Sequence, residues 1–136
     1  MAENDLDRLI AAAKDVATRA YAPGSNFAVG AALEAEDGRV FVGCNVENAS
    51  FGLTVCAERN AVCHAVAEGA RRFVRCVVYT PLSEPGLPCG ACRQVLAEFG
   101  RTMEIVLVGT SEVVRTMSLA EILPKPFLFE DLEAGN

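Results

Sequence analysis

The sequence predicts an α/β fold with three layers, α/β/α, in which a mixed five-stranded sheet lies between helices. Two observations predict it. Segments with apolar residues at helical spacing alternate with short apolar runs of strand length. The later part of the chain runs strand–helix–strand, an order that favours parallel neighbours. A chain of 136 residues has the size of one domain, so we expect a single domain over residues 1–136.

The first third of the chain predicts one helix and one β-hairpin. Apolar residues recur at helical spacing over residues 4–21, with Asn4 or Asp5 available as a cap and Pro23-Gly24 beyond the C-terminus. A turn sequence follows, Glu36-Asp37-Gly38. The apolar runs on either side of this turn predict two hairpin strands, residues 27–34 and 39–44.

The rest of the chain alternates helices with strands. Gly69 and Gly100 follow apolar segments at the points where helices are expected to end. Ser118 and Glu121 have capping-box spacing and predict the start of a short last helix. The other expected segments are a loop over 45–55, helices over 56–68 and 89–99, a loop over 81–88, strands over 73–80, 103–109 and 113–117, and a tail over 124–136.

Composition excludes several classes of protein. The net charge of −6 disfavours DNA or RNA as a partner, because phosphate binding needs clustered Lys and Arg. No run of about 18 apolar residues is present, which disfavours a membrane span. The first seven residues are polar and acidic, unlike a signal peptide, so we expect a cytoplasmic protein. Cys44, Cys63 and Cys76 lie in apolar or mixed surroundings, and we expect them to be small buried hydrophobic residues.

The other three cysteines have the spacing of metal ligands. Cys89 and Cys92 form a Pro-Cys-x-x-Cys motif, and Cys56 begins a Cys-Ala-Glu sequence that ends at Glu58. All three lie at predicted helix starts, where free N–H groups stabilise thiolates. Three ligands on one Zn²⁺ ion per chain leave a position for water, whose protons Glu58 would move. We expect Arg59 to offset the charge of the thiolates. The pattern is typical of zinc-dependent nucleobase deaminases.

The Cys-x-x-Cys motif has other interpretations. A Cys-x-x-Cys pair also occurs in redox proteins and zinc ribbons. A redox pair leaves Cys56 and Glu58 without a role, however, and a ribbon needs a fourth ligand. His64 is the only histidine, and we interpret it as a helix-surface residue because it lies two turns from the metal end of its helix. A non-catalytic zinc module remains an alternative, and in it Glu58 would be dispensable.

Five stretches match a known family in the same order along nearly the whole chain. They are Phe27–Ala32, Gly43–Ala49, Cys56–Arg59, Pro88–Gln94 and the ending Leu123-Pro124, Phe127 and Glu130–Leu132. Together they resemble the small homotetrameric zinc-dependent cytidine deaminases. The resemblance implies a cytidine deaminase-like fold and the hydrolytic deamination of cytidine and 2′-deoxycytidine to uridine and 2′-deoxyuridine plus ammonia, in pyrimidine salvage.

The resemblance also implies the residues that bind the substrate. Asn45 and Glu47 match the pair that holds the ribose, and an amide and a carboxylate both suit hydroxyl groups. Phe27 matches an aromatic residue that stacks on the base, and the Ala57 N–H is expected to contact the base. Phe127 matches an aromatic residue that reaches the active site of a neighbouring subunit. The expected partners are therefore a small nucleoside and other copies of the same chain.

The chain departs from the family pattern at three positions near the expected site. Gly24 and Phe51 stand where tyrosines are common in the family, and Phe129 makes the ending bulkier than usual. These departures leave open a related substrate, such as blasticidin S or a modified cytosine nucleoside.

Overall fold

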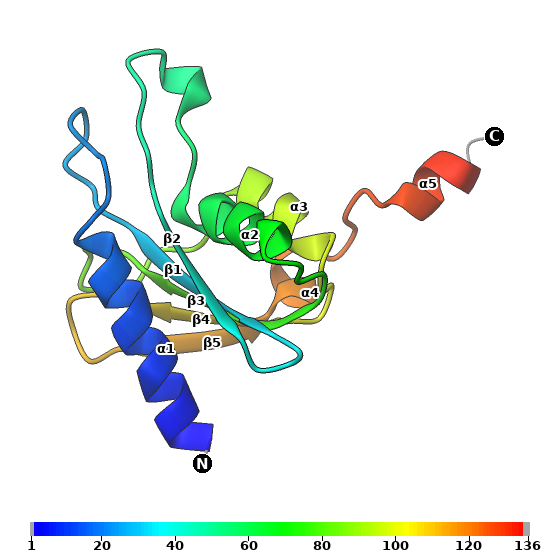
Figure 1. Cartoon of the computed structure of the whole chain (residues 1–136), viewed down its shortest axis with the longest axis horizontal. Helices are drawn as coiled ribbons and strands as arrows, with labels where there is room; N and C mark the ends of the chain where they lie inside the picture. Colours follow the sequence, from blue (N-terminus) through cyan, green and yellow to red (C-terminus); the bar gives the residue numbers. More distant parts are fainter. Residues whose placement is uncertain (1, 135–136) are drawn as a thin grey trace.

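The computed structural model describes residues 2–134 and contains one mixed five-stranded sheet of strand order β2-β1-β3-β4-β5 (Figure 1). Among these strands, β3 and β4 pair in parallel and every other neighbouring pair is antiparallel. The strands are β1 Gly30–Ala35, β2 Val40–Cys44, β3 Phe73–Tyr79, β4 Glu104–Val108 and β5 Val114–Ser118. The helices are α1 Ala2–Ala17, α2 Ala57–Ala67, α3 Gly90–Ala97, α4 Leu119–Ile122 and α5 Phe129–Ala134.

The parallel pairing expected for the later strands is confirmed for β3 and β4 and is wrong for β5. The chain passes through α3 between β3 and β4. This helical crossover returns the chain to the end of the sheet at which β3 began, so β4 runs parallel to β3. Only residues 109–113 separate β4 from β5. Such a connection is long enough for a hairpin and too short for a crossover, so β5 runs antiparallel.

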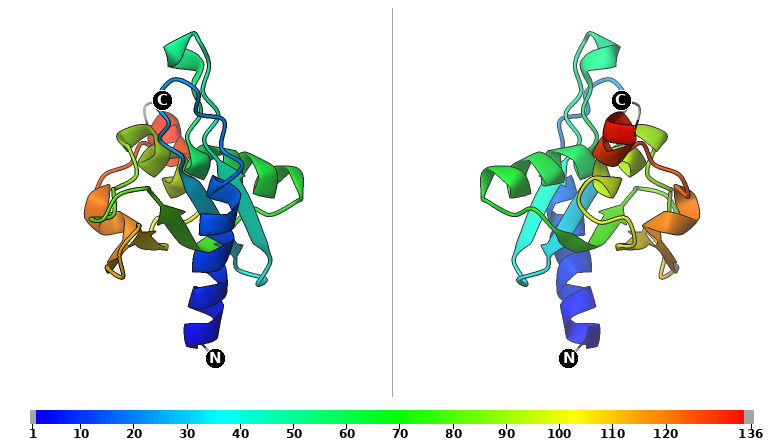
Figure 2. Two further views of the ribbon diagram at one scale, coloured as in Figure 1. Left: turned by 90° about the vertical axis from the view of Figure 1, so that its left-hand side faces the viewer. Right: turned by 90° about the vertical axis from the view of Figure 1, so that its right-hand side faces the viewer.

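Helices cover both faces of the sheet, which confirms the three-layer α/β/α fold (Figures 1 and 2). On one face, Leu9 of α1 packs in a core cluster that contains Val77 of β3. On the other face, Ala61 of α2 and Leu96 of α3 belong to a larger cluster. Strands β1, β3 and β4 are therefore largely buried, whereas most of β5 is exposed. Helices α2 and α3 share one face.

Two glycines allow the helices to lie close to the sheet. A Cβ atom at Gly30 of β1 would lie 2.0 Å from the Ala13 carbonyl oxygen of α1. A Cβ atom at Gly43 of β2 would lie 2.3 Å from the Ala61 nitrogen of α2. Because both distances are far below van der Waals contact, a side chain at either position would push a helix off the sheet.

The bounds of α1 differ from the prediction. The helix begins at Ala2, so Asn4 and Asp5 lie inside it, and their prediction as caps is wrong. Acidic residues are favourable in a first helical turn, which explains how the helix extends past them. It ends at Ala17, and residues 18–20 continue as turns in which each N–H donates to the carbonyl three residues earlier.

The first hairpin forms as predicted, but its first strand is shorter. Strand β1 begins at Gly30 instead of residue 27. The Val29 N–H donates to the side-chain oxygen of Asn45 (2.9 Å). At this residue a side chain, and not a neighbouring strand, accepts the hydrogen bond of the backbone N–H. The turn contains Gly38 at φ +91°, a conformation that glycine adopts at little cost.

The end of the chain forms two short helices. Ser118 and Glu121 make both hydrogen bonds of the predicted capping box, which confirms the start of α4. Helix α5 was not predicted, because six residues are too few for a periodic apolar pattern to be recognised. It extends away from the sheet, while the loop over residues 45–56 projects at the end opposite the start of α1 (Figures 1 and 2).

Of the three cysteines that we expected to be buried, one is exposed. Cys76 of β3 is buried and Cys44 is half-buried. Cys63 is exposed, so the prediction is wrong there. The buried face of α2 is formed by Ala61 and its neighbours, which turns the side chain of Cys63 toward solvent.

Candidate active site and metal centre

Three cysteine sulfur atoms meet at the N-terminal ends of α2 and α3. Cys56 is the N-cap of α2, Cys89 is the N-cap of α3 and Cys92 lies in the first turn of α3. The Cys89 Sγ lies 3.9 Å from that of Cys56 and 3.4 Å from that of Cys92, and all three lie within 4.8 Å of one another. The fold therefore brings together residues that are 33 positions apart, as their spacing predicted.

The surroundings of the three thiols suit a bound cation. Burial raises the pKa of the Cys92 thiol, and the nearby Glu58 carboxylate raises it further. Holding this sulfur as a thiolate therefore calls for a positive charge. Burial opposes ionisation of Cys89, but hydrogen bonds from the start of α3 outweigh it and lower the pKa of that thiol. Three thiolates that leave one position open fit zinc.

Arg59 lies beside one of the three thiols. Its Nη2 donates to the Cys56 Sγ at 3.6 Å. The hydrogen bond to Cys56 raises the pKa of Arg59, so the guanidinium stays charged beside the sulfur. This contact is the one expected if Arg59 offsets the negative charge of three thiolates.

Glu58 is a buried carboxyl group in the first turn of α2. Only 4% of its surface is exposed. Burial raises its pKa, although the charge of Arg59 and a hydrogen bond with Cys92 partly oppose this. A buried carboxyl group with a raised pKa is suited to accepting and returning a proton, as general acid–base chemistry requires.

Asn45 and Glu47 lie along the loop that follows β2. Asn45 is buried and joins the chain before β1, since its Oδ1 accepts from Val29 N–H (2.9 Å) and its Nδ2 donates to the Phe27 carbonyl (2.8 Å). An amide carries two donor hydrogens and two acceptor lone pairs. One donor and one acceptor of Asn45 therefore remain for a ligand.

Glu47 is held by the turn at residues 24–25. Its Oε1 accepts from the backbone N–H groups of Gly24 (2.8 Å) and Ser25 (3.2 Å), and its Oε2 accepts from the Ser25 hydroxyl. These hydrogen bonds, that of the Ser25 side chain above all, lower the pKa of Glu47. Ser25 could not be recognised as a partner from local spacing, because the contact joins segments 22 residues apart.

The remaining predicted site residues occupy three different segments. Ala57 is fully buried at the first position of α2, where the helix leaves its N–H without an internal partner. Phe27 is 37% exposed in the segment before β1. Phe127 is 59% exposed in the tail, and its backbone contacts Gln94 of α3. Gln94 lies in the quoted Pro88–Gln94 motif, but sequence reasoning gave it no role.

The comparisons with known proteins agree with this geometry. Residues 3–109 match the family model of the zinc-binding region of cytidine and deoxycytidylate deaminases. The chain belongs to the cytidine deaminase family. It is 44% identical over 129 residues to the cytidine deaminase of Sporosarcina psychrophila, covering 94% of this chain and 95% of that protein. Zinc is the metal of this family region, and the thiols at Cys56, Cys89 and Cys92 fit it.

Solved structures of cytidine deaminases share the fold. The crystal structure of cytidine deaminase from Burkholderia pseudomallei superimposes with a TM-score of 0.86 at 51% identity, covering 89% of this chain and 98% of that chain. The enzyme from Mycobacterium tuberculosis gives a TM-score of 0.79 at 42% identity, covering 90% of this chain and 97% of that chain.

His64 lies outside the metal cluster of this family member. Its side chain is exposed, and its Nδ1 lies 3.1 Å from the Val42 carbonyl oxygen. Its ring also packs edge-on against Phe41 at a centroid distance of 5.6 Å. These contacts support the interpretation of His64 as a helix-surface residue.

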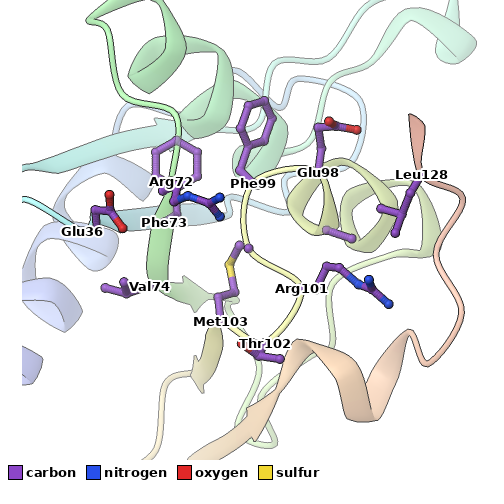
Figure 3. A pocket seen from close by; sticks show the side chains of 12 residues that line it. Glu36, Arg72, Phe73, Val74, Glu98, Phe99, Arg101, Thr102, Met103 and Leu128 are labelled. Carbon is purple, nitrogen blue, oxygen red and sulfur yellow. The ribbon is translucent and has the colours of Figure 1, made fainter. Parts of the chain in front are cut away.

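Two cavities differ in their relation to the deaminase site. One of about 850 Å³ adjoins Glu47 and is lined by Gly24, Tyr21 and Phe51, so two of the departures from the family pattern border it. The other, of about 500 Å³, lies around the first residues of β3 and the chain after α3 (Figure 3). It contains none of the predicted site residues, whereas the loop with Cys89 follows the opposite end of β3.

Proposed function

We propose that this chain hydrolyses cytidine and 2′-deoxycytidine to uridine and 2′-deoxyuridine plus ammonia, and that residues 1–136 act as one catalytic domain. The observation that carries the proposal is the buried Glu58 carboxyl group in the first turn of α2, beside three convergent thiols. A structural zinc site needs no such group. Family membership at 44% identity over most of the chain supports the same reaction.

The proposed mechanism gives each residue of the centre one task. Cys56, Cys89 and Cys92 hold zinc, which when bound lowers the pKa of water at its open position. Glu58 takes a proton from the attacking water as oxygen bonds to C4 of the cytosine ring. Glu58 delivers that proton to N3, takes the second proton from the hydroxyl group now bonded to C4 and passes it to the departing amine. The C4–N bond breaks, ammonia leaves and uracil remains. Arg59 stabilises the Cys56 thiolate throughout.

The nucleoside is proposed to lie along the loop that contains Asn45 and Glu47. The free donor and acceptor of Asn45, and the remaining lone pairs of the ionised Glu47, would bind the ribose hydroxyl groups. Phe27 would stack on the base, and its carbonyl contact with Asn45 links base recognition to ribose recognition. The Ala57 N–H would donate to the base.

We further propose that the chain acts as a homotetramer in which Phe127 reaches the active site of a neighbouring copy. Phe51 is 84% exposed and Phe127 is 59% exposed. Large aromatic surfaces of this kind on projecting segments are typical of contact regions between chains. Each site is then completed by a residue from another chain.

Pyrimidine salvage in the cytoplasm is the proposed setting of this activity, because the reaction converts one free nucleoside into another. Among residues 2–134, no helix has both the length and the apolar character needed to cross a membrane. The location itself stays a prediction.

A related substrate has one observation in its favour. Gly24 borders the cavity of about 850 Å³ next to Glu47, and a Cβ atom at this position would lie 3.3 Å from the Glu47 Oε1. The absence of a side chain leaves room beside the proposed ribose contact. Blasticidin S or a modified cytosine nucleoside therefore remains the second candidate.

Product formation from a panel of substrates tests the proposal. The purified protein would be assayed with cytidine, 2′-deoxycytidine, free cytosine, cytidine monophosphate and blasticidin S, while bound zinc is quantified in the same sample. Turnover confined to the two nucleosides at one zinc per chain is the expected result. A zinc-loaded protein that deaminates neither nucleoside would overturn it, and turnover of blasticidin S alone would favour the second candidate.

A further inference from the structure

Gln94 ties the tail of the chain to the helix that carries two of the thiols. Its side-chain Nε2 donates to the Phe127 carbonyl at 2.6 Å, and its Oε1 accepts from the Phe127 N–H at 3.0 Å. Both halves of one amide thus bind the backbone of a single residue 33 positions away. Cys92 lies two residues before Gln94 in the same helix. The position of Phe127 is therefore coupled to the metal centre through α3.

The neighbouring Arg93 anchors the chain just before the tail. Its Nη1 donates to the Ile122 carbonyl at 2.9 Å, and its Nε donates to the Pro88 carbonyl at 2.8 Å. Pro88 directly precedes the thiol of Cys89. Consecutive residues of α3 therefore hold the segment from Ile122 to Phe127 at both of its ends.

The two hydrogen bonds from Gln94 hold the backbone of Phe127 without burying its ring. Phe127 remains 59% exposed, whereas the side chain of the next residue, Leu128, lies between the tail and α3 and lines a cavity there (Figure 3). A short tail that packed only on its own chain would bury its aromatic ring first, because burial of apolar surface is what stabilises it. Here hydrogen bonds order the chain, and the ring faces outward.

We propose that Gln94 is a positioning residue that holds the Phe127 ring in place for the active site of a second copy of this chain. This inference rests on the proposed function, which gives Phe127 that role. Gln94 acts through Phe127 and does not touch the substrate. Its amide is suited to the task because a backbone unit offers one donor and one acceptor, and an amide side chain pairs with both.

The orientation of Phe127 can be tested without any enzyme assay. 4-Fluorophenylalanine would be placed at residue 127 of the zinc-loaded protein and followed by fluorine NMR. Gln94→Glu keeps the side-chain size but sets a carboxylate against the Phe127 carbonyl, and Gln94→Met removes both hydrogen bonds without adding charge. Both variants should shift and sharpen the resonance. Glu98→Gln, at the exposed C-cap of α3 about one turn beyond Gln94, is the matched control and should leave it unchanged.

An unchanged fluorine resonance in both Gln94 variants would overturn the inference, whether or not the protein deaminates cytidine. Lack of cytidine turnover in the unmodified protein is a different result, which counts against the proposed function alone. The two failures are therefore distinguishable.

Steady-state kinetics then separate positioning from a general structural role. Gln94→Glu should raise the KM for cytidine about tenfold, because a small misplacement of a binding group is costly, with zinc content and oligomeric state unchanged. Phe127→Ala should have a similar effect, and the double variant should be no worse than Phe127→Ala alone. If the effects of the two single substitutions on KM added up in the double variant, or if Gln94→Glu lost zinc, Gln94 would have a structural role and the positioning role would be refuted.

Discussion

Glu58 distinguishes an enzyme from a zinc-stabilised module at the scale of single residues. Glu58→Gln keeps the size and the buried position of the side chain but removes the carboxyl group that is proposed to move protons. We expect kcat/KM for cytidine to fall by about a hundredfold to ten-thousandfold, the usual range for loss of a general acid–base group, while zinc stays at one ion per chain. Kinetics and zinc analysis of the same preparation measure both effects.

Glu68→Gln is the matched control for that experiment, because Glu68 is exposed at the other end of α2. It should leave kcat/KM unchanged. If Glu58→Gln retained full activity, the proposed mechanism would be wrong and the non-catalytic alternative would return.

The second prediction at this scale concerns the ionisation of Glu47. Its pKa is lowered chiefly by the hydrogen bond from the Ser25 side chain, so the carboxylate stays ionised at a pH where a free glutamate takes up a proton. Ser25→Ala should therefore raise the pKa of Glu47 toward its ordinary value. A carbon NMR titration of the glutamate carboxyl groups measures the change directly.

Ser50→Ala serves as the control, since Ser50 lies in the same projecting loop and its side chain makes no capping hydrogen bond. It should leave the Glu47 titration unaltered. The same Glu47 midpoint in the Ser25→Ala variant would show that the serine hydroxyl does not control this carboxylate.

Sequence reasoning located the metal centre but missed the groups that hold its neighbours in place. Cys89 and Cys92 are recognisable because both lie in one short motif, and Cys56 with Glu58 forms another. The contact of Ser25 with Glu47 and that of Gln94 with Phe127 join distant segments. Such pairs depend on how loops cross in space, which local spacing does not encode.

At the scale of elements, the close packing of α2 against β2 positions the start of α2, where Cys56 and Glu58 lie. A methyl group at Gly43 would lie 2.3 Å from the Ala61 nitrogen, and neither backbone can yield easily. Gly43→Ala should lower the free energy of unfolding by about 1–3 kcal/mol, as overpacking does. It should also weaken zinc retention, because Cys56 and Glu58 lie at the start of the displaced helix. Urea unfolding and zinc competition by a chelator measure the two effects.

Gly52→Ala is the control substitution, since among residues 2–134 no atom outside the glycine's own stretch of chain lies within 4 Å of the added methyl group. Its effect on unfolding should stay within about 0.5 kcal/mol, as for other surface changes. Equal stability of the two variants would mean that the close contact between α2 and β2 is not a constraint.

The elements that could be predicted are those whose sequence patterns depend only on residues close together in the chain. Helical periodicity predicted α2 and α3, and the turn at residues 36–38 predicted the first hairpin, because both follow from neighbouring residues. The direction of β5 follows instead from the short connection after β4, and α5 is too short to leave a periodic pattern.

At the scale of the whole molecule, two projecting segments carry aromatic surface away from the core. The loop over residues 45–56 presents Phe51, and the tail presents Phe127 and Phe129, each more than half exposed. Together with Glu47 in the same loop, these segments place proposed substrate contacts far from the sheet. The proposed active site shared between copies would give these exposed aromatic side chains a role, although the chain carries a net charge of −6.

Mixed oligomers test whether the active site is shared. Phe127→Ala chains keep Glu58, and Glu58→Ala chains keep Phe127, so each variant alone should have low activity. After co-refolding in equal amounts, about a quarter of the sites would combine an intact Glu58 with a Phe127 from a neighbouring variant chain, if the symmetric assembly forms at random. Activity should then rise well above the mean of the two parent variants. If Phe127 instead served its own chain, every site would keep its defect, and the mixture would show only that mean activity.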